Sequence, residues 1–275
     1  MEEGNRNRNR PLILVVNDDG IEADGLKAAI RAAQPYGDLL IAAPAKQQTA
    51  MGRAYPRYDD LGVIEPTMLN LGNQKIQAYA VHSSPAHAVC YGAMELADRK
   101  PDLLVSGINH GANVGMTVTC SGTIGACLEA VSEGIPAIAL SLETDSDVIM
   151  NARTESDFRY AEKAGAKWIE HILNHGMPDD CSILNVNVPN CPVEPDEYRI
   201  TCLDRQNYYQ MVSPPSRDWS QRYTMDFQIE VDVDTLTEGS DIEAMVVKRK
   251  ISVTPLTWDL TLRRTLGGSH EIYTN

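Results

Sequence analysis

The sequence predicts an α/β fold in which a mostly parallel β-sheet is covered by helices on both faces. Between residues 11 and 190, apolar runs of strand length alternate with segments of helical periodicity. Several of these runs are continuously apolar, which is typical of strands buried on both faces of a parallel sheet. Beyond residue 190 the alternation ends, and prolines, aromatic residues and extended patterns take over. We therefore expect a three-layer core followed by an extended C-terminal segment with hairpins.

The first part of the core contains two strands separated by a helix. Leu12–Val16 (LILVV) is a continuous run rich in branched residues and is the first predicted strand. Apolar residues then recur at helical spacing, at Leu26, Ala29, Ile30 and Ala33. Asp38–Ala43 (DLLIAA) is the second predicted strand. The stretch 46–80 has no clear helix, and we expect a loop or a hairpin that projects from the sheet edge.

The rest of the core continues the alternation of helices and strands. The predicted helices are Pro85–Arg99, Ser121–Glu133 and Thr154–Asn174, and the second of these is closed by Gly134. The predicted strands are Asp102–Val105, Pro136–Leu140 and Ser182–Val188. Thr154 and Asp157 stand at the spacing of a capping box, so the third helix is expected to begin at Thr154.

The chain divides into three parts by composition. Residues 1–10 (MEEGNRNRNR) are polar, lack the apolar region of a secretory signal, and are expected to be disordered. Residues 11–191 form the predicted α/β core. Residues 192–275 form an extension that we expect to contribute to a homodimer or homotetramer and to return to the core. Its segment SVTPLTWDL has few charges and carries an aromatic residue, although this segment could also pack only on its own core.

Composition excludes several classes of protein. The chain has 275 residues, a formal net charge of -14 and no basic patch, which argues against a nucleic-acid duplex as partner. No apolar run approaches the ~20 residues that a membrane helix needs. The six cysteines have no CxxC spacing, so we interpret them as reduced thiols, several of them in the core. We expect a cytoplasmic protein without a membrane partner.

Polar residues follow three of the predicted strands. The first strand is followed by NDDG, which contains Asp18 and Asp19, the second by APAKQQT, and the third by SGINHGAN. Ligands of open parallel sheets bind beyond the carboxyl ends of the strands. Carboxylate, hydroxyl and carboxamide oxygens suit Mg²⁺, Mn²⁺ or Ca²⁺, and a cation would offset the repulsion between the two aspartates. The alternative is that Asp18 and Asp19 form a helix cap and a solvated turn.

A second group of small and hydroxyl residues stands at the start of a predicted helix. In TCSGTIGA, Ser121 and Thr123 flank Gly122, which allows a close approach to the backbone. Free N–H groups at a helix start bind anions, although such a sequence is also an ordinary helix cap. Beside a cation site, an anion site suggests hydrolysis of a phosphoester. The chain has no GxxxxGK[ST] motif, so the sequence does not support phosphoryl transfer from ATP by a P-loop enzyme. It also has no GxGxxG motif of dinucleotide-binding proteins and no GxSxG nucleophile elbow of α/β-hydrolases.

Five blocks together resemble the SurE family, the survival-protein phosphatases. They are LILVVNDDGIEADGLKAA, PDLLVSGINHGANVG, SGTIGA, GIPAIALSL and ISVTPLTWDLT, in family order between about Pro11 and Leu262. The resemblance implies a Rossmann-like core with a C-terminal extension that swaps between subunits. It also implies a 5′-nucleotidase, a metal-dependent phosphomonoesterase that acts on nucleoside 5′-monophosphates, often on 3′-monophosphates, and in some members on short polyphosphate.

The resemblance also implies the site residues. One divalent cation per subunit, Mg²⁺ or Mn²⁺ with Ca²⁺ as a substitute in crystals, would be held by Asp18, Asp19, Thr49 and Asn109. The phosphate would rest on Asn113, Ser121, Gly122 and Thr123. Asp18 and Asp19 would be the catalytic residues. As a hypothesis, water attacks phosphorus in line and Asp19 handles proton transfer, although the sequence leaves the choice between the two aspartates open.

The chain departs from the family pattern around this site. Thr49 and Ala50 stand where the family commonly has serine and glycine. His87 replaces an acidic residue, and Met116 and Thr117 replace an acidic pair. These changes suggest a narrower or shifted substrate range. They leave two alternatives open: a nucleotide-binding or regulatory protein with low turnover, and a phosphatase of non-nucleotide phosphates or polyphosphate.

Overall fold

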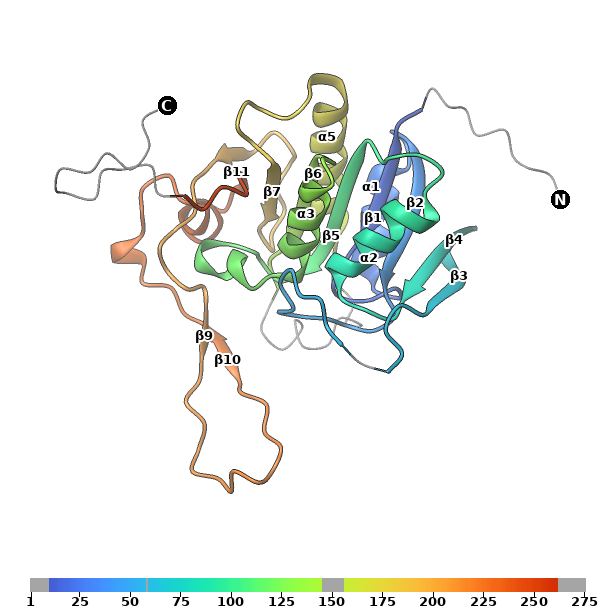
Figure 1. Cartoon of the computed structure of the whole chain (residues 1–275). Coiled ribbons are helices and arrows are strands. Elements are labelled where there is room, and N and C mark those ends of the chain that lie inside the picture. Colours follow the sequence, from blue (N-terminus) through green and yellow to red (C-terminus); the bar gives the residue numbers. More distant parts are fainter. Residues whose placement is uncertain (1–9, 58, 145–155, 262–275) are drawn as a thin grey trace, which may run out of the picture.

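The computed structural model describes residues 10–57, 59–144 and 156–261, and a nine-stranded sheet runs through its centre (Figure 1). The strand order is β3-β4-β2-β1-β5-β6-β7-β11-β8. Most of the region expected to be disordered, residues 1–9, lies outside the described residues, as do residues 262–275 of the extension. Within the described part, no helix is long and apolar enough to cross a membrane.

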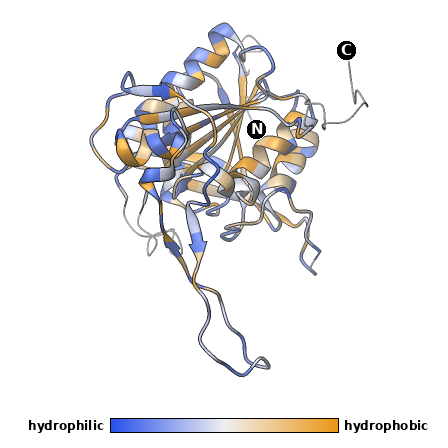
Figure 2. Cartoon of the chain, turned by 90° about the vertical axis from the view of Figure 1, so that its left-hand side faces the viewer, coloured by the Kyte–Doolittle hydropathy of each residue, from blue (hydrophilic) through white to orange (hydrophobic). Residues whose placement is uncertain are grey.

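The central strands are parallel, as the continuous apolar runs predict. Their order is β4 (Gln74–Val81), β2 (Asp38–Pro44), β1 (Leu12–Val16), β5 (Leu103–His110), β6 (Ala137–Leu142) and β7 (Ile183–Val188). Every residue of β1, β6 and β7 is buried, and Figure 2 shows hydrophobic colouring through the strands of the interior. The α/β fold with a mostly parallel sheet is confirmed.

Both edges of the sheet contain antiparallel pairs. β3 (Ile64–Leu71) pairs with β4 as a hairpin, and β4 pairs in parallel with β2. The hairpin expected between residues 46 and 80 therefore extends the main sheet rather than projecting from it. At the other edge, β11 (Ile251–Leu256) runs antiparallel to β7 and parallel to β8 (Tyr198–Ile200).

Helices cover both faces of the sheet. α1 (Asp24–Ala33) and α5 (Arg159–His175) pack into one apolar cluster, and α2 (Pro85–Tyr91) and α3 (Gly122–Ser132) pack into another on the opposite face. α2 continues as a π-helical turn, η1 (Gly92–Leu96), and the chain turns extended at Ala97, before the predicted end at Arg99.

The start of α5 differs from the prediction. The helix begins at Arg159 with Phe158 at its N-cap, whereas a capping box at Thr154 and Asp157 predicts an earlier start. Thr154 lies outside the described residues. Asp157 precedes the helix and accepts hydrogen bonds from the backbone N–H of Arg159 at 3.1 Å and from its guanidinium Nε at 2.8 Å. The local bond to Arg159 thus replaces the predicted cap.

β5 is longer than predicted, because the chain returns to the sheet after an irregularity. The register against β6 shifts between Ser106 and Asn109, and pairing then continues through His110. Gly107 has a φ of +125°, and a Cβ there would lie 2.2 Å from the carbonyl oxygen of Leu140. The residues expected in a loop after Val105 therefore include strand residues, and this places Asn109 and His110 at the carboxyl end of the sheet.

The C-terminal segment forms a hairpin and then returns to the core. β9 (Tyr209–Met211) and β10 (Phe227–Ile229) pair antiparallel, and the loop between them extends away from the core (Figure 1). Two short helical turns, η3 (Val233–Thr235) and η4 (Glu243–Val247), precede β11.

The structure corrects the placement of the cysteines. All six are free, but only Cys127 is fully buried. Cys120 and Cys202 are exposed, and the remaining three are partly buried. The expectation that several of them lie in the core is therefore wrong.

Candidate functional site

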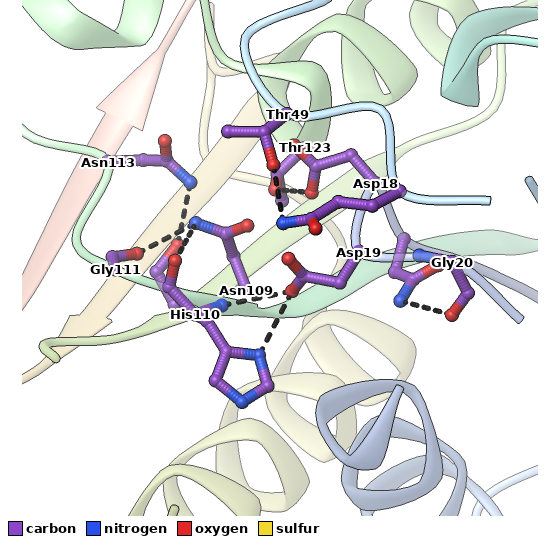
Figure 3. A network of polar contacts seen from close by, with 12 residues as sticks. Asp18, Asp19, Gly20, Thr49, Asn109, His110, Gly111, Asn113 and Thr123 are labelled. Carbon is purple, nitrogen blue, oxygen red and sulfur yellow. Dashed lines mark hydrogen bonds and ion pairs between the residues drawn. The ribbon is translucent and has the colours of Figure 1, made fainter. Parts of the chain in front are cut away.

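The predicted site residues meet at the carboxyl ends of β1 and β5 and at the N-terminus of α3 (Figure 3). Asp18 and Asp19 follow β1, Asn109 lies near the end of β5, and Thr123 lies in the first turn of α3. The topology brings these elements together because β1 and β5 are neighbouring parallel strands. This is the edge of an open parallel sheet where ligands bind.

Asp18 is held by the start of α3. Only 4% of Asp18 is exposed, and the hydroxyl of Thr123 donates a hydrogen bond to its Oδ1 at 2.8 Å. A Cβ on Gly122 would lie 2.7 Å from Oδ2 of Asp18, so this close approach requires glycine. The SGT block therefore packs directly against the first aspartate.

The electrostatics of Asp18 are unfavourable without a positive partner. Burial, and then the charge of Asp19, raise the pKa of Asp18 to about 7, while hydrogen bonds from Thr123 act in the opposite direction. In the described part of the chain, no lysine or arginine forms an ion pair with either aspartate. The site thus contains a buried pair of acids that lacks a cationic side chain.

Asp19 is oriented by His110. Both the backbone N–H and the ring Nδ1 of His110 contact Oδ2 of Asp19, at 3.1 and 3.2 Å. Figure 3 shows the other carboxylate oxygen of Asp19 turned toward Asn109 and Asp18. The sequence places His110 next to Asn109 in the same motif but gives it no role, and only the structure shows its contact with Asp19.

The turn that carries the aspartates is closed by its own first residue. Asn17 is fully buried, its Nδ2 donates to the carbonyl of Gly20 at 3.0 Å, and its Oδ1 accepts from the N–H of Gly20 at 3.3 Å. Asp19 is only 7% exposed, and the N-cap of α1 is Ala23, which makes no side-chain cap. The alternative of a solvated turn and helix cap is therefore wrong for Asp18 and Asp19.

The second strand-end loop is fixed beside Asp18. The N–H of Gln48 donates to the carbonyl of Asp18 at 2.7 Å, and the N–H of Gly52 donates to the carbonyl of Cys120 at 3.0 Å. Thr49, between them, is exposed, and its hydroxyl accepts from Nε2 of Gln47 at 2.8 Å. Figure 3 shows Thr49 in the same close view as Asp18 and Thr123.

The departure at Ala50 has a visible backbone consequence. Ala50 has a φ of +59°, in the left-handed region that favours glycine. The chain therefore keeps a turn for which glycine is suited while carrying an alanine. The loop retains its shape at the expense of local strain.

A buried acid holds the far end of this loop. Glu129 of α3 is 3% exposed, and its Oε2 accepts from Nε of Arg53 at 2.7 Å and from the hydroxyl of Tyr55 at 2.6 Å. The sequence gives no signal for this network, because Glu129 lies in an ordinary helical pattern. Its geometry anchors the loop that carries Thr49 to the helix that supports Asp18.

Asn109 turns its carboxamide toward the aspartates. Its Nδ2 donates to the carbonyl of Gly111 at 2.8 Å and to that of His110 at 3.3 Å. These two bonds direct Oδ1 toward the aspartate carboxylates, as Figure 3 shows. The position agrees with a ligand oxygen at this end of β5.

Asn113 is the most constrained of the predicted phosphate-binding residues. Its Nδ2 donates to the hydroxyl of Ser141 at 2.9 Å. Its backbone N–H donates to Oδ1 of Asn187 at 2.7 Å, and its carbonyl accepts from Nδ2 of Asn185 at 2.8 Å and of Asn187 at 3.1 Å. The signal for these residues is the pattern LNVNV, in which carboxamides alternate with apolar residues in a fully buried strand.

The hydroxyls of the SGT block are already engaged within the chain. The Oγ of Ser121 accepts from the N–H of Ile124 at 3.2 Å and caps α3, whereas the hydroxyl of Thr123 contacts Asp18. The hydroxyl of Ser106 donates to the carbonyl of Thr123 at 2.9 Å. What remains for an anion in this block is the O–H of Ser121, which no described hydrogen bond uses as a donor, the backbone N–H of Gly122 and the positive end of the α3 dipole.

The remaining departures lie around the site rather than in it. His87 lies in the first turn of α2, where its ring stacks on Tyr55 with centroids 4.6 Å apart. Met116 is 51% exposed, whereas Thr117 is buried and its hydroxyl donates to the carbonyl of Val114. The structure thus places one member of the Met116–Thr117 pair at the surface and uses the other to close a turn.

The donor set fits a hard divalent cation. The structure shows no cluster of three or more His, Cys, Asp or Glu residues that could hold a metal among the residues it describes. The set here combines two carboxylates with a hydroxyl and a carboxamide, all oxygen donors of the kind that Mg²⁺ and Mn²⁺ prefer. The uncompensated acids Asp18 and Asp19 are the observation that supports this fit.

Comparison with known proteins gives a consistent result. Residues 13–210 match the family described as Survival protein SurE. A protein named 5′-nucleotidase SurE from Methanobrevibacter smithii is 38% identical over 252 residues, 90% of this chain and 95% of the relative. One of the same name from Methanocella arvoryzae is 36% identical, over 90% of this chain and 92% of the relative. The crystal structure of SurE protein from Aquifex aeolicus matches with a TM-score of 0.68 and 29% identity, over 91% of this chain and 95% of that chain.

Proposed function

The chain belongs to the SurE family, and on this premise we propose that it is a 5′-nucleotidase that removes phosphate from nucleoside 5′-monophosphates with the help of a divalent cation. The observation that carries the proposal is the buried pair Asp18 and Asp19, without a cationic side chain, packed against the N-terminus of α3. A cation bound between the two carboxylates would offset their negative charge. An anion bound at the start of α3 would offset the positive end of the helix dipole.

The cation would be Mg²⁺ or Mn²⁺, one per subunit, and its proposed ligands are Asp18, Asp19, Thr49 and Asn109. The supporting geometry is that Oδ1 of Asn109 and the free oxygen of Asp19 point toward Asp18, and that the Thr49 loop is bonded to the Asp18 backbone. When bound, such a cation would polarise the phosphoryl oxygens and lower the pKa of a coordinated water.

The chain's own groups would hold the phosphate and move the proton. The carboxamide of Asn113, fixed by Ser141, and the N–H of Gly122 would hold the phosphate oxygens. The O–H of Ser121 would donate to the phosphate while its oxygen caps α3, and Thr123 would act through Asp18. We assign proton transfer to Asp19, because His110 binds only one of its oxygens and the other faces the site.

Assembly is a separate part of the proposal. We infer that residues 192–275 contribute to a homodimer or homotetramer. The described part of this extension exposes large apolar side chains, with Trp219 90%, Trp258 63% and Leu260 96% exposed. A mainly apolar cavity of about 710 Å³ lies between Trp258 and the residues Leu128 and Val131 of α3. Sizing by light scattering tests this inference, and a monomer at all concentrations would contradict it.

The free cysteines support a proposal for the cellular location of the protein. We propose a cytoplasmic enzyme, because its six cysteines are free and two of them are exposed. Fractionation of cells that produce the protein would test this location.

The experiment that tests the function is phosphate release from a panel of substrates. The panel contains nucleoside 5′- and 3′-monophosphates, short polyphosphate and non-nucleotide phosphomonoesters, each with Mg²⁺ or Mn²⁺ and with a chelator control. We expect cation-dependent release from 5′-monophosphates, which Asp18→Asn abolishes. Nucleotide binding with no release from any substrate would favour the regulatory alternative. Release only from polyphosphate or from non-nucleotide phosphomonoesters would favour the second alternative, a phosphatase of these substrates.

A further inference from the structure

We propose that His110 is a positioning residue for the cation site: through its ring it sets the orientation of the Asp19 carboxylate. This inference rests on the proposed function, because it concerns the same cation. The observation is that two donors of one residue, the backbone N–H and Nδ1 of His110, meet one oxygen of Asp19, at 3.1 and 3.2 Å. Two donors on one oxygen leave the other oxygen of Asp19 for a ligand.

The chemistry of the contact determines the state of the ring. A carboxylate that holds a cation only accepts hydrogen bonds, so in the proposed site the tautomer of His110 with the proton on Nδ1 is the one that donates to Asp19. The contact is buried from solvent, with side-chain exposures of 0% for His110 and 2% for Asp19. A bond of this kind is stronger than one at the surface because water does not compete for it.

The surroundings of the ring show that His110 acts through Asp19 and not on the substrate. The ring packs edge-on against Phe158, with centroids 4.9 Å apart and an interplanar angle of 87°. Figure 3 shows the ring directed away from Asn109, Asn113 and Thr49. Its Nε2 is buried and has no hydrogen-bond partner in the described ranges, so no described polar group competes with Asp19 for the ring's orientation.

The backbone of β5 explains why this contact forms. After the irregularity at Gly107, Asn109 and His110 resume pairing with Ser141 and Leu142 of β6. Adjacent strand residues point to opposite sides. One residue of the pair therefore presents its carboxamide to the site, while the next reaches behind Asp19. Groups that orient metal ligands in this way typically change metal affinity by about 10–100-fold when they are removed.

The test measures binding of Mn²⁺ alone by calorimetry, so that turnover is not needed. His110→Leu keeps an apolar side chain against Phe158 but removes the donor, and we expect its Kd for Mn²⁺ to rise by about 10–100-fold. His110→Asn carries an N–H donor at the position of Nδ1 and should restore most of the affinity. His110→Gln carries its donor farther out and should resemble His110→Leu. These last two variants decide the question if His110→Leu does not fold.

The matched control is Phe158→Leu, which disturbs the packing of the ring and leaves the hydrogen bond to Asp19. We expect it to lower the melting temperature while the Kd for Mn²⁺ stays at the wild-type value. Equal Mn²⁺ affinity in His110→Leu and wild type would overturn the proposal, as would equal weakening by Phe158→Leu. A folded wild-type protein that binds no Mn²⁺ or Mg²⁺ would instead overturn the cation site of the proposed function.

Discussion

The carboxamide of Asn187 bonds both backbone polar groups of Asn113, accepting from the N–H at 2.7 Å and donating to the carbonyl at 3.1 Å. The side chain of Asn187, in strand β7, thus makes the two hydrogen bonds to the backbone of Asn113 that a neighbouring strand would otherwise make. Both residues are buried, with Asn187 0% and Asn113 6% exposed. The loop that carries a predicted phosphate contact is therefore fixed from below by β7.

We predict that Asn187→Leu weakens phosphate binding more than cation binding. The substitution leaves the N–H of Asn113 buried without this partner, at a cost of about 1–3 kcal/mol. We expect KM for nucleoside monophosphates and the inhibition constant for inorganic phosphate to rise about tenfold, which corresponds to ~1.4 kcal/mol. Steady-state kinetics and a titration with Mn²⁺ measure the two effects separately.

The control for this prediction is Thr254→Val on β11. Thr254 is 1% exposed and pairs in register with Asn185, and its hydroxyl contacts that of Thr201 at 2.7 Å, whereas no hydrogen bond among the described residues joins it to Asn113. It should lose stability without a change in the inhibition constant for phosphate. A similar increase in both variants would mean that Asn187 contributes only to the stability of the sheet.

Gly122→Ala is expected to abolish most activity in a folded protein. Its Cβ would stand 2.7 Å from Oδ2 of Asp18, and a shift of that carboxylate displaces a proposed ligand. Gly165→Ala in α5 is the matched control, because the close contact of its Cβ is with the end of the flexible Leu140 side chain, at 2.8 Å, and Ala32 lies at an ordinary contact distance of 3.6 Å. Phosphate release and circular dichroism compare the two, and full activity in Gly122→Ala would show that Asp18 moves freely.

The two aspartates should respond differently to neutralisation. In chelator, Asp18→Asn removes the repulsion between buried charges, and we expect the free energy of unfolding to rise by about 1 kcal/mol or more. The same variant should bind no cation. Urea unfolding with chelator and with excess Mn²⁺ measures both effects, and lower stability of Asp18→Asn in chelator would contradict the prediction.

For Asp19→Asn the expectation concerns the rate. If Asp19 handles the proton, kcat should fall by about 10²–10⁴-fold even at saturating cation and substrate. A nearly normal kcat under those conditions would remove Asp19 from proton transfer and leave it a ligand only.

Ala50→Gly should stabilise the protein or leave its stability unchanged. The left-handed conformation, with φ +59°, costs a residue with a side chain roughly 1–2 kcal/mol. Glycine avoids this strain, but it lowers stability by about 0.5–1 kcal/mol because it loses more conformational entropy when the chain folds. Ala54→Gly in the same loop serves as control and should destabilise, because φ at Ala54 is not positive. Denaturant unfolding of both variants checks the difference. Destabilisation of equal size would show that Ala50 is not strained.

The sequence pattern predicted those elements whose ends are set by residues that are neighbours in the sequence. The strand Leu12–Val16 ends where predicted, because a continuous apolar run is followed directly by the polar turn that Asn17 closes. The pattern failed where a longer-range contact decided the outcome. β5 continues past Val105 because pairing with β6 resumes after Gly107. The start of α5 at Arg159 differs from the prediction for a local reason, since Asp157 binds the backbone N–H and the guanidinium of Arg159.

By itself, the sequence determined the alternation of strands and helices, the family, and the residues that supply oxygen donors at the strand ends. These depend on apolar periodicity and on the chemistry of each side chain, which are properties of short segments. Only the tertiary structure decided which groups hold those donors in place: Thr123 on Asp18, His110 on Asp19, and Asn187 on Asn113. The two members of each pair lie 105, 91 and 74 residues apart in the sequence. They meet because the parallel sheet places side by side the ends of strands that are distant in the sequence.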